Sequence, residues 1–284
     1  MGKEIHVVIG HDNIRQNEVL FGTALVDMYA KCGILLQAQE LFDEIPIHDV
    51  ASWNALAGGY VQQGHGHEAL NCFESMLKEG VSPDAITFTC ILKACGKMGA
   101  IDKGKKIHHE IVRRGLLEKD IVLGTALVDM YAKCGMLKKA QQVLEDLPFR
   151  NIVSWSVLIA GCVQHGQSHE ALNCFERMQS EGLPPDMVIF VCLLKACGSI
   201  GAIHKGKQIH DEIASKGLLA TDVMLGTALV DMYAKCGMLL KAKQVLEELP
   251  FRNVVSWSAL ISGYVQQGQG HEALNCFVEM KRNG

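Results

Sequence analysis

The sequence repeats itself with a period of 102 residues, and this period constrains the fold more than any other feature. The string GTALVDMYAKCG begins at Gly22, Gly124 and Gly226, and a Ser-Trp pair recurs at Trp53, Trp155 and Trp257. Such self-similarity is typical of stacked supersecondary units, because each unit can bury its apolar face only against its neighbours. The chain is therefore predicted to be a repeat array and not a single globular core.

Each period contains helical hairpins, as residues 121–151 illustrate. Apolar side chains recur at helical spacing, first at Leu127, Met130, Tyr131 and Cys134, then at Ala140, Val143, Leu144 and Leu147. Gly135 is expected to end the first helix, because glycine accepts the left-handed conformation of a helix C-terminus, and Pro148 stops the second. Residues 152–186 and 187–222 complete the period, so the three hairpins have 31, 35 and 36 residues.

A polar stripe is predicted on the side of the first helix that faces away from this apolar face. At about 100° per residue, Val122, Thr125, Asp129 and Lys133 cluster roughly 145° from it. A small apolar residue, a hydroxyl, a carboxylate and an amine return in every equivalent unit, whereas solvation alone would need only charge. Stacked hairpins would align these side chains along one groove, which suits a linear polymer.

Composition narrows the possible ligands. The formal net charge of −4 lacks the basic excess with which a non-specific binder displaces counterions from phosphate, so a nucleic-acid role must rest mainly on reading bases. Eleven cysteines without a C-x-x-C pair indicate neither a disulfide framework nor a zinc ribbon. The sequence has no apolar run near the roughly 18 residues that span a bilayer, and its N-terminus lacks the pattern of a secretory signal.

The strings VVSWSALISGYVQQGQGHEALNCF and GTALVDMYAKCG, together with the rhythm of 31, 35 and 36 residues, resemble the plant PLS-class pentatricopeptide repeat (PPR) proteins over essentially the whole chain. The resemblance implies an all-α fold, a right-handed superhelical α-solenoid of stacked helix-turn-helix repeats forming one domain. The units would be a partial L repeat at 1–18, S repeats at 19–49, 121–151 and 223–253, P repeats at 50–84 and 152–186, L repeats at 85–120 and 187–222, and an incomplete P repeat at 254–284. The chain looks like a window of a longer array.

The resemblance also implies a function, the binding of single-stranded RNA at about one base per repeat, with the strand running 5′ to 3′ from the N- to the C-terminal end. In this family the fifth and the last residue of a unit choose the base. The implied pairs are Thr23 with Asp49 for G, Asn54 with Asp84 for U, Thr125 with Asn151 for A, Ser156 with Asp186 for G, and Thr227 with Asn253 for A. Thr89 with Asp120 and Val191 with Asp222, in the L units, are left unspecified, and Ser258 lacks a partner within the sequence. The implied site is 5′-GUNAGNA-3′.

The resemblance implies roles in RNA binding for two further sets of residues. Aliphatic second residues would wedge between bases, at Leu20, Ala51, Val122, Val153, Met224 and Val255. Lysines would lie near phosphate, at Lys31, Lys133 and Lys235. The resemblance implies target recognition in organellar C-to-U editing or RNA processing, in mitochondria or chloroplasts, with organellar editing factors contacting the L repeats. It implies no enzyme activity, cofactor, metal, membrane or small-molecule substrate.

Some motifs have a competing chemical interpretation. H-x-E, at His108 and His210, occurs in zinc deaminases, but the matching P-C-x-x-C is absent. GAIDKGK at Gly99 has the spacing of a phosphate loop, but the expected context is helix-turn-helix and no Ser or Thr follows. The tryptophans and the cysteines of AKCG and KACG are expected to pack between helices.

Two other functions remain open. A protein-binding scaffold is suggested by the low net charge and by the similarity to tetratricopeptide hairpins, whose grooves hold peptides. The covariation of Asn, Thr and Ser at the fifth position with a residue 26 to 30 places later favours a base code instead. The units could also guide a catalytic domain that this sequence does not contain.

Overall fold

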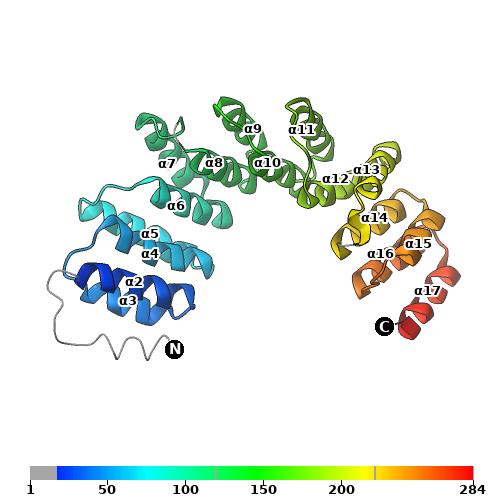
Figure 1. Ribbon diagram of the computed structural model, residues 1–284, viewed down its shortest axis with the longest axis horizontal. Coiled ribbons are helices and arrows are strands. Elements are labelled where there is room, and N and C mark those ends of the chain that lie inside the picture. Colours follow the sequence, from blue (N-terminus) through cyan, green and yellow to red (C-terminus); the bar gives the residue numbers. More distant parts are fainter. Residues whose placement is uncertain (1–17, 119, 221, 284) are drawn as a thin grey trace. The chain divides into compact units, whose positions relative to one another are not determined.

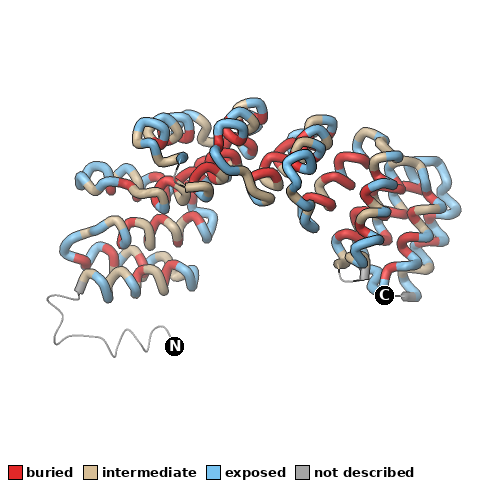
Figure 2. Tube along the Cα trace, turned by 45° about the horizontal axis from the view of Figure 1, so that its top comes forward, coloured by how far each residue is buried: buried red, intermediate tan, exposed pale blue. Residues whose placement is uncertain are grey.

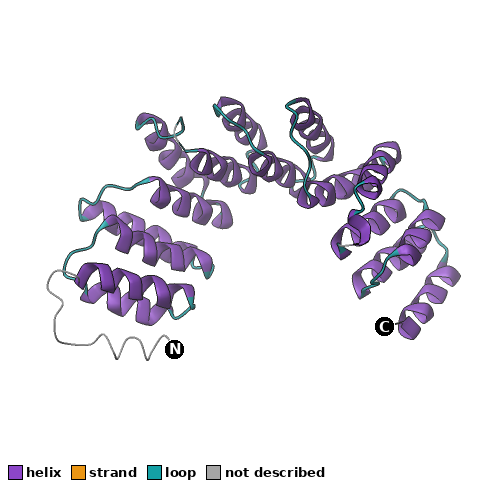
Figure 3. Ribbon diagram, in the orientation of Figure 1, coloured by secondary structure: helices purple, strands orange, loops and turns teal. Residues whose placement is uncertain are grey.

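The computed structural model describes residues 18–118, 120–220 and 222–283. Regular structure in these ranges consists of α-helices and one short 3-10 helix, with no β-strand (Figure 3). Residues 1–17, which form most of the predicted partial L repeat, lie outside the described residues. None of the described helices is long and apolar enough to cross a bilayer.

Consecutive helices pair into hairpins, which we number 1 to 8 in chain order (Figure 1). The chain divides into two compact lobes, one ending at Arg150 and one starting at Asn151. The first lobe holds hairpins 1 to 4, made of α2 (Glu18–Lys31), α3 (Leu35–Glu44), α4 (Val50–Gln62), α5 (Gly66–Lys78), α6 (Ala85–Met98), α7 (Ile101–Arg113), α8 (Ile121–Lys133) and α9 (Leu137–Asp146).

The second lobe repeats this organisation with hairpins 5 to 8. Its elements are α10 (Ile152–Gln164), α11 (Ser168–Ser180), α12 (Met187–Ile200), α13 (Ile203–Ser215), η1 (Leu218–Ala220), α14 (Val223–Lys235), α15 (Leu239–Glu248), α16 (Val254–Gln266) and α17 (Gly270–Asn283).

Each lobe has two layers of helices. The first helices of successive hairpins contact one another, from α2 to α8 in the first lobe and from α10 to α16 in the second. Each second helix packs against its own first helix and against the first helix of the next hairpin within its lobe. The buried residues concentrate where the helices face one another (Figure 2). Within each lobe, the first helices therefore form a continuous layer whose other side is available for a ligand.

The helix ends follow from local sequence. Gly135 adopts a φ of 74°, and the Met136 N–H donates to the Tyr131 carbonyl at 2.9 Å, which closes α8. The second helix ends one residue earlier than its apolar spacing suggests. Leu147 is extended, with a ψ of 134°, because the helical conformation is disfavoured before proline, yet its side chain is buried.

Candidate nucleic-acid interface

The last residue of seven predicted units is the N-cap of the next first helix. These N-caps are Asp49, Asp84, Asp120, Asn151, Asp186, Asp222 and Asn253. Their Oδ1 atoms accept hydrogen bonds from backbone N–H groups that a helix start would otherwise leave unpaired. At Asp49, for example, the Ser52 N–H donates to Oδ1 at 2.8 Å, and the Asp49 N–H donates back to Ser52 Oγ at 3.0 Å.

The cap decides which atom is left for a ligand. When Oδ1 is held by the helix, an aspartate retains Oδ2, which can only accept, and an asparagine retains its NH₂, which can only donate. Asn151 and Asn253 are held in this way by Ser154 and Ser256 at 2.9 and 2.8 Å. An Asp-to-Asn exchange at an N-cap therefore reverses the hydrogen-bonding character of the remaining atom and leaves the helix start intact.

The caps that end hairpins 3 and 6 have a different geometry. Asp120 and Asp222 accept from the backbone N–H groups of both the second and the third residue of the next helix. Their ψ angles are 100° and 109°, whereas ψ is 177° at Asp49 and 178° at Asp186. Because ψ sets the direction of the chain at the cap, these two carboxylates are oriented differently from the side chains of the other five N-cap residues.

The fifth residues lie on the first helices with differing environments. Thr23, Asn54, Thr125, Ser156 and Thr227 are half-buried, and Ser258 is exposed. The oxygens Thr23 Oγ1 and Ser156 Oγ are buried without a hydrogen-bond partner among the described residues. An unpaired buried hydroxyl costs about 1–3 kcal/mol, and a ligand group that reached it would recover part of this.

Hairpin 2 shows the fifth and the last residue in direct contact. Asn54 Nδ2 donates to Asp84 Oδ1 at 3.1 Å, although 30 residues separate them. Burial alone would raise the pKa of Asp84, but hydrogen bonds from the Thr87 N–H, the Asn54 amide and the Thr87 hydroxyl hold it below its usual value. Asp84 is therefore an ionised acceptor at neutral pH.

These residues line one open hollow on the first-helix layer. The hollow has a volume of about 740 Å³ and gathers six of the predicted residues of hairpins 1 and 2, namely Leu20, Thr23, Asp49, Ala51, Asn54 and Asp84. It is also lined by Ile86, the second residue of hairpin 3, which is 66% exposed. Sequence reasoning did not single out Ile86, although Val188 stands 102 residues later and is also exposed.

The other predicted wedges are exposed aliphatic side chains in register. Val122, Val153, Met224 and Val255 are each at least 57% exposed, and Leu20 is 71% exposed. Ala51 is exposed but small. Thr125 belongs to the first lobe and Asn151 to the second, so the third predicted pair stays a prediction.

The predicted phosphate-contacting lysines already bind a carboxylate. Lys31 pairs with Asp27 at 2.6 Å, Lys133 with Asp129 at 2.6 Å, and Lys235 with Asp231 at 2.7 Å, four residues earlier in each case. Their charge is therefore largely neutralised locally. Lys133 also lines a second hollow of about 410 Å³ together with Lys93 and Lys97 of α6, two lysines that sequence reasoning did not single out.

Comparisons with known proteins agree with this architecture. Residues 23–50, 86–116, 125–152, 227–254 and 255–284 match the PPR repeat, and residues 48–97 and 150–199 match the PPR repeat family. The chain belongs to the PPR repeat family.

Solved structures support the fold. Maize PPR10 aligns over 99% of this PPR chain and 41% of its own chain, with a TM-score of 0.80 and 18% sequence identity. PPR10 in complex with an 18-nt psaJ RNA element aligns over 99% of this chain and 42% of its own, with a TM-score of 0.82 and the same identity. The predicted all-α helical-repeat solenoid is confirmed.

Curated relatives are plant PPR proteins. A chloroplastic pentatricopeptide repeat-containing protein of Arabidopsis thaliana is 36% identical over 283 residues, which cover 100% of this chain and 45% of the relative. A putative mitochondrial one from the same organism is 38% identical over 259 residues, covering 91% and 41%. The PPR chain thus spans less than half the length of these relatives.

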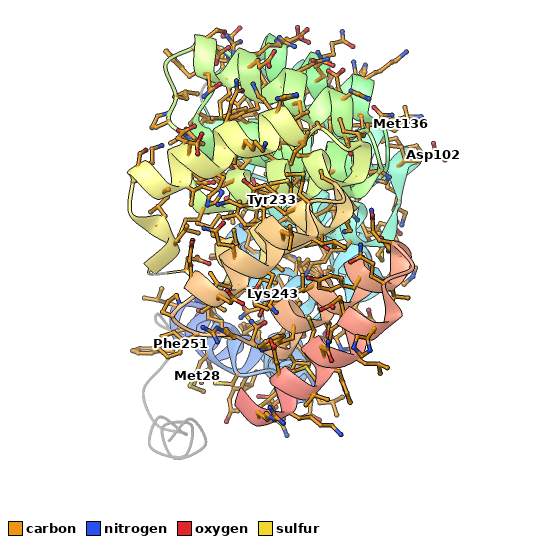
Figure 4. The ribbon with its side chains drawn as sticks, turned by 90° about the vertical axis from the view of Figure 1, so that its right-hand side faces the viewer. Met28, Asp102, Met136, Tyr233, Lys243 and Phe251 are labelled. Atoms are coloured by element: carbon orange, nitrogen blue, oxygen red, sulfur yellow. The ribbon has the colours of Figure 1, made fainter. Side chains whose placement is uncertain are left out.

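The H-x-E motifs are structural contacts between PPR repeats. His108 Nδ1 lies 2.9 Å from the Tyr131 hydroxyl of the next repeat, and His210 Nδ1 lies 2.9 Å from that of Tyr233. Tyr233, labelled in Figure 4, lies within the helix stack and is 1% exposed. The carboxylate of Glu110 binds Arg113 and Arg114, and the described residues include no cluster of side chains suited to a metal.

The GAIDKGK segment is likewise a packing feature. Gly99 caps α6 in the left-handed conformation, and Gly104 lies so close to Met130 that a Cβ atom would approach its Sδ to 2.5 Å. The segment is therefore the turn and second helix of a PPR hairpin, in which glycine leaves room for the Met130 side chain of α8. Of the cysteines predicted to pack between helices, Cys95 and Cys197 are buried and Cys134 and Cys236 are half-buried, whereas Cys32 is exposed. Burial raises the pKa of the Cys72 thiol to about 12 and that of Cys95 to about 11, so these thiols are protonated at neutral pH.

Proposed function

We propose that this chain binds single-stranded RNA in a sequence-specific manner, reading one base with each of hairpins 1, 2, 4, 5 and 7. The observation that carries the proposal is the fixed N-cap geometry, which leaves one hydrogen-bonding atom of each last residue free of the helix; in hairpin 2 this last residue is in direct contact with the fifth residue. PPR10, which has the same fold, has been solved with a bound RNA element, and this supports RNA as the ligand class. The role is that of a binding module and not of an enzyme.

The atom left by the cap selects between two classes of base. Guanine and uracil carry an N–H at the ring position of their Watson–Crick edge, which pairs with an aspartate Oδ2. Adenine and cytosine carry an acceptor nitrogen there, which pairs with an asparagine NH₂. Asp49, Asp84 and Asp186 therefore favour G or U, and Asn151 and Asn253 favour A or C.

The size and chemistry of the fifth residue complete the selection. Asn54 reaches farther than threonine or serine, so it leaves room only for the smaller pyrimidine bases. It also offers an amide N–H to a uracil carbonyl. The shorter side chains of Thr23, Thr125, Ser156 and Thr227 leave room for a purine. The resulting site is 5′-GUNAGNA-3′, with hairpins 1, 4 and 7 as S repeats, hairpins 2 and 5 as P repeats and hairpins 3 and 6 as L repeats of a PLS-class protein. The different cap geometry of Asp120 and Asp222 supports leaving the bases at hairpins 3 and 6 unspecified.

In the cell, we place this recognition in organellar C-to-U editing or RNA processing. The chloroplastic and mitochondrial relatives support an organelle as the compartment.

A protein-binding role is the second candidate, because one hollow lies away from the base-reading residues. It has a volume of about 330 Å³ between α5 and α7, with Leu70, Phe73, Leu77 and Ile107 in its wall and charged side chains around them. This apolar character suits a protein side chain better than a nucleotide. The two roles use different layers of helices and are compatible.

The binding experiment compares a labelled oligoribonucleotide containing GUNAGNA with a scrambled one of equal composition, at two salt concentrations. We expect a preference on the order of 10-fold or more, since several base contacts of about 1 kcal/mol each are lost in the scramble. The salt dependence should be shallow, because few lysines are free to face phosphate. Equal affinities for the two strands would reject the base code and leave the scaffold role.

A further inference from the structure

The Asn54–Asp84 pair has a third member, Thr87, at the third position of α6. The side chain of Thr87 is 2% exposed. Its hydroxyl oxygen lies 2.7 Å from Asn54 Oδ1 and 2.8 Å from Asp84 Oδ1, and it accepts the Asp84 N–H at 3.2 Å. A residue of hairpin 3 therefore bonds to both base-reading residues of hairpin 2.

This contact fixes the orientation of the Asn54 amide. The amide oxygen shares the single hydrogen of the Thr87 hydroxyl with Asp84 Oδ1, while the amide nitrogen donates to Asp84 at 3.1 Å. The two ends of the amide thus have different partners, which leaves its second hydrogen and Asp84 Oδ2 to serve a base. If the hydroxyl were absent, the amide oxygen would lose its partner and the side chain could rotate.

The second copy of this site provides a natural comparison within the same chain. The residue 102 positions after Thr87 is Ile189, which is fully buried and has no hydroxyl. There the Asp186 carboxylate still accepts the Ile189 backbone N–H at 2.8 Å, so the cap forms without the side chain. Ser156 Oγ, the fifth-position atom of that hairpin, has no hydrogen-bond partner among the described residues. The hydroxyl of Thr87 is therefore dispensable for holding the cap carboxylate. Ser52 and Ser256 also carry a hydroxyl at the third helix position, but these hydroxyls bond to their own N-cap residues, whereas that of Thr87 also reaches the fifth residue of the preceding hairpin.

We propose that Thr87 is a positioning residue for base selection by hairpin 2, so that the choice of the second base depends on three residues and not on two. The inference rests on the proposed function, since it concerns how the Asn54–Asp84 pair reads RNA. Uracil needs a donor from Asn54 opposite its carbonyl, whereas cytosine presents an amino group at that place. Holding the amide nitrogen toward the base side consequently favours uracil over cytosine.

The test measures the affinity ratio between two RNAs that differ only in U or C at the second base, for the wild-type chain and three variants. Thr87→Val removes the hydroxyl at nearly constant shape and should lower the U-over-C ratio by about 5-fold or more, the effect of one net hydrogen bond. Thr87→Ser retains the hydroxyl and should keep the U-over-C ratio close to that of the wild-type chain. Ile189→Val, the matched control, should leave it unchanged.

A second affinity ratio, measured on the same proteins, separates a loss of base selection by hairpin 2 from a loss of folding. The G-over-A ratio at the first base, which Thr23 and Asp49 read, should be the same in all four proteins. Each ratio compares two affinities on one preparation, so a partial loss of folded protein cancels. A wild-type U-over-C ratio that survives in Thr87→Val overturns this inference and leaves the base code standing. A wild-type chain without any preference at the second base overturns the proposed function and this inference together.

Discussion

Asn54 and Asp84 meet across a repeat boundary, and the proposed function gives each a recognition role besides its structural one. Asp84 starts α6 with one carboxylate oxygen and keeps the other for a ligand, and Asn54 is bound to both Asp84 and Thr87. The base preference of hairpin 2 should therefore change when the pair is changed as a pair.

The double variant Asn54→Thr with Asp84→Asn reproduces the Thr227–Asn253 pair of hairpin 7. We expect its second-base preference to move from U toward A, because the shorter fifth residue admits a purine and the asparagine NH₂ donates to the adenine ring nitrogen. Competition binding with four RNAs that differ only at the second base measures this. An unchanged order of the four affinities would show that the pair does not read the base.

Part of this residue-scale arrangement could be predicted from the sequence. An Asp or Asn followed three residues later by Ser is a recognisable capping signature, and it is present at Asp49, Asn151 and Asn253. The Asp–Lys spacing of four was also visible. The burial of the Thr23 and Ser156 hydroxyls could not be predicted, because it depends on how closely neighbouring first helices pack.

At the level of helices, the N-caps connect stability and recognition. Replacing Asp49 by Ala should destabilise the protein by about 1 kcal/mol, because the first N–H groups of α4 lose their acceptor, and should also weaken the preference for G at the first base. Chemical denaturation and competition binding measure the two effects.

The control for this prediction is Asp49→Asn. Asparagine caps as well as aspartate, so stability should stay close to wild type while the first-base preference moves from G toward A. Equal changes of stability in the Ala and Asn variants would contradict the capping role.

The His–Tyr contacts between hairpins predict a pH-dependent stability. Burial lowers the pKa of His108 and His210, assisted by the nearby Lys139 and Lys241. Since the unfolded chain then binds protons more readily than the folded one, stability is complete above about pH 6.5 and falls as the pH drops through the lowered values.

Thermal melts at pH 7.5 and 5.5 test this directly. The wild-type melting temperature should be lower at pH 5.5, and the difference should shrink in the double variant His108→Gln with His210→Gln. A difference of undiminished size in that variant would assign the effect to other histidines.

For the whole molecule, ion pairs between lysines and nearby aspartates limit how strongly the lysines can bind RNA phosphates. Lys31, Lys133 and Lys235 are each bound to an aspartate, and these pairs are partly exposed, so they contribute little to stability. The triple variant Asp27→Asn, Asp129→Asn, Asp231→Asn should fold normally and bind all RNAs more tightly, because three lysines become free for phosphate.

The diagnostic for this variant is the dependence of affinity on salt. Three additional phosphate contacts should steepen the slope of log affinity against log salt by about 2, and specificity should fall because scrambled RNA gains equally. An unchanged slope would show that these lysines lie away from the strand.

The large-scale fold followed readily from the sequence because a period of 102 residues repeats the same local signals. The helices α4, α6, α8, α10, α12, α14 and α16 begin at residues 50, 85, 121, 152, 187, 223 and 254, the first residues of seven predicted units, whereas α2 begins at Glu18, one residue before its unit. The division into lobes at Arg150 was not predictable, since the repeat pattern continues across it without interruption.

The use of one side chain both to start a helix and to face a ligand has a consequence for engineering. A transplantable recognition cassette would not coincide with a hairpin. It would extend from the fifth residue of one hairpin to the third residue of the next, for example from Asn54 to Thr87, so that the reader, the cap and the group that orients them travel together. Cutting at the conventional junction before Ala85 would separate Thr87 from the two residues it holds.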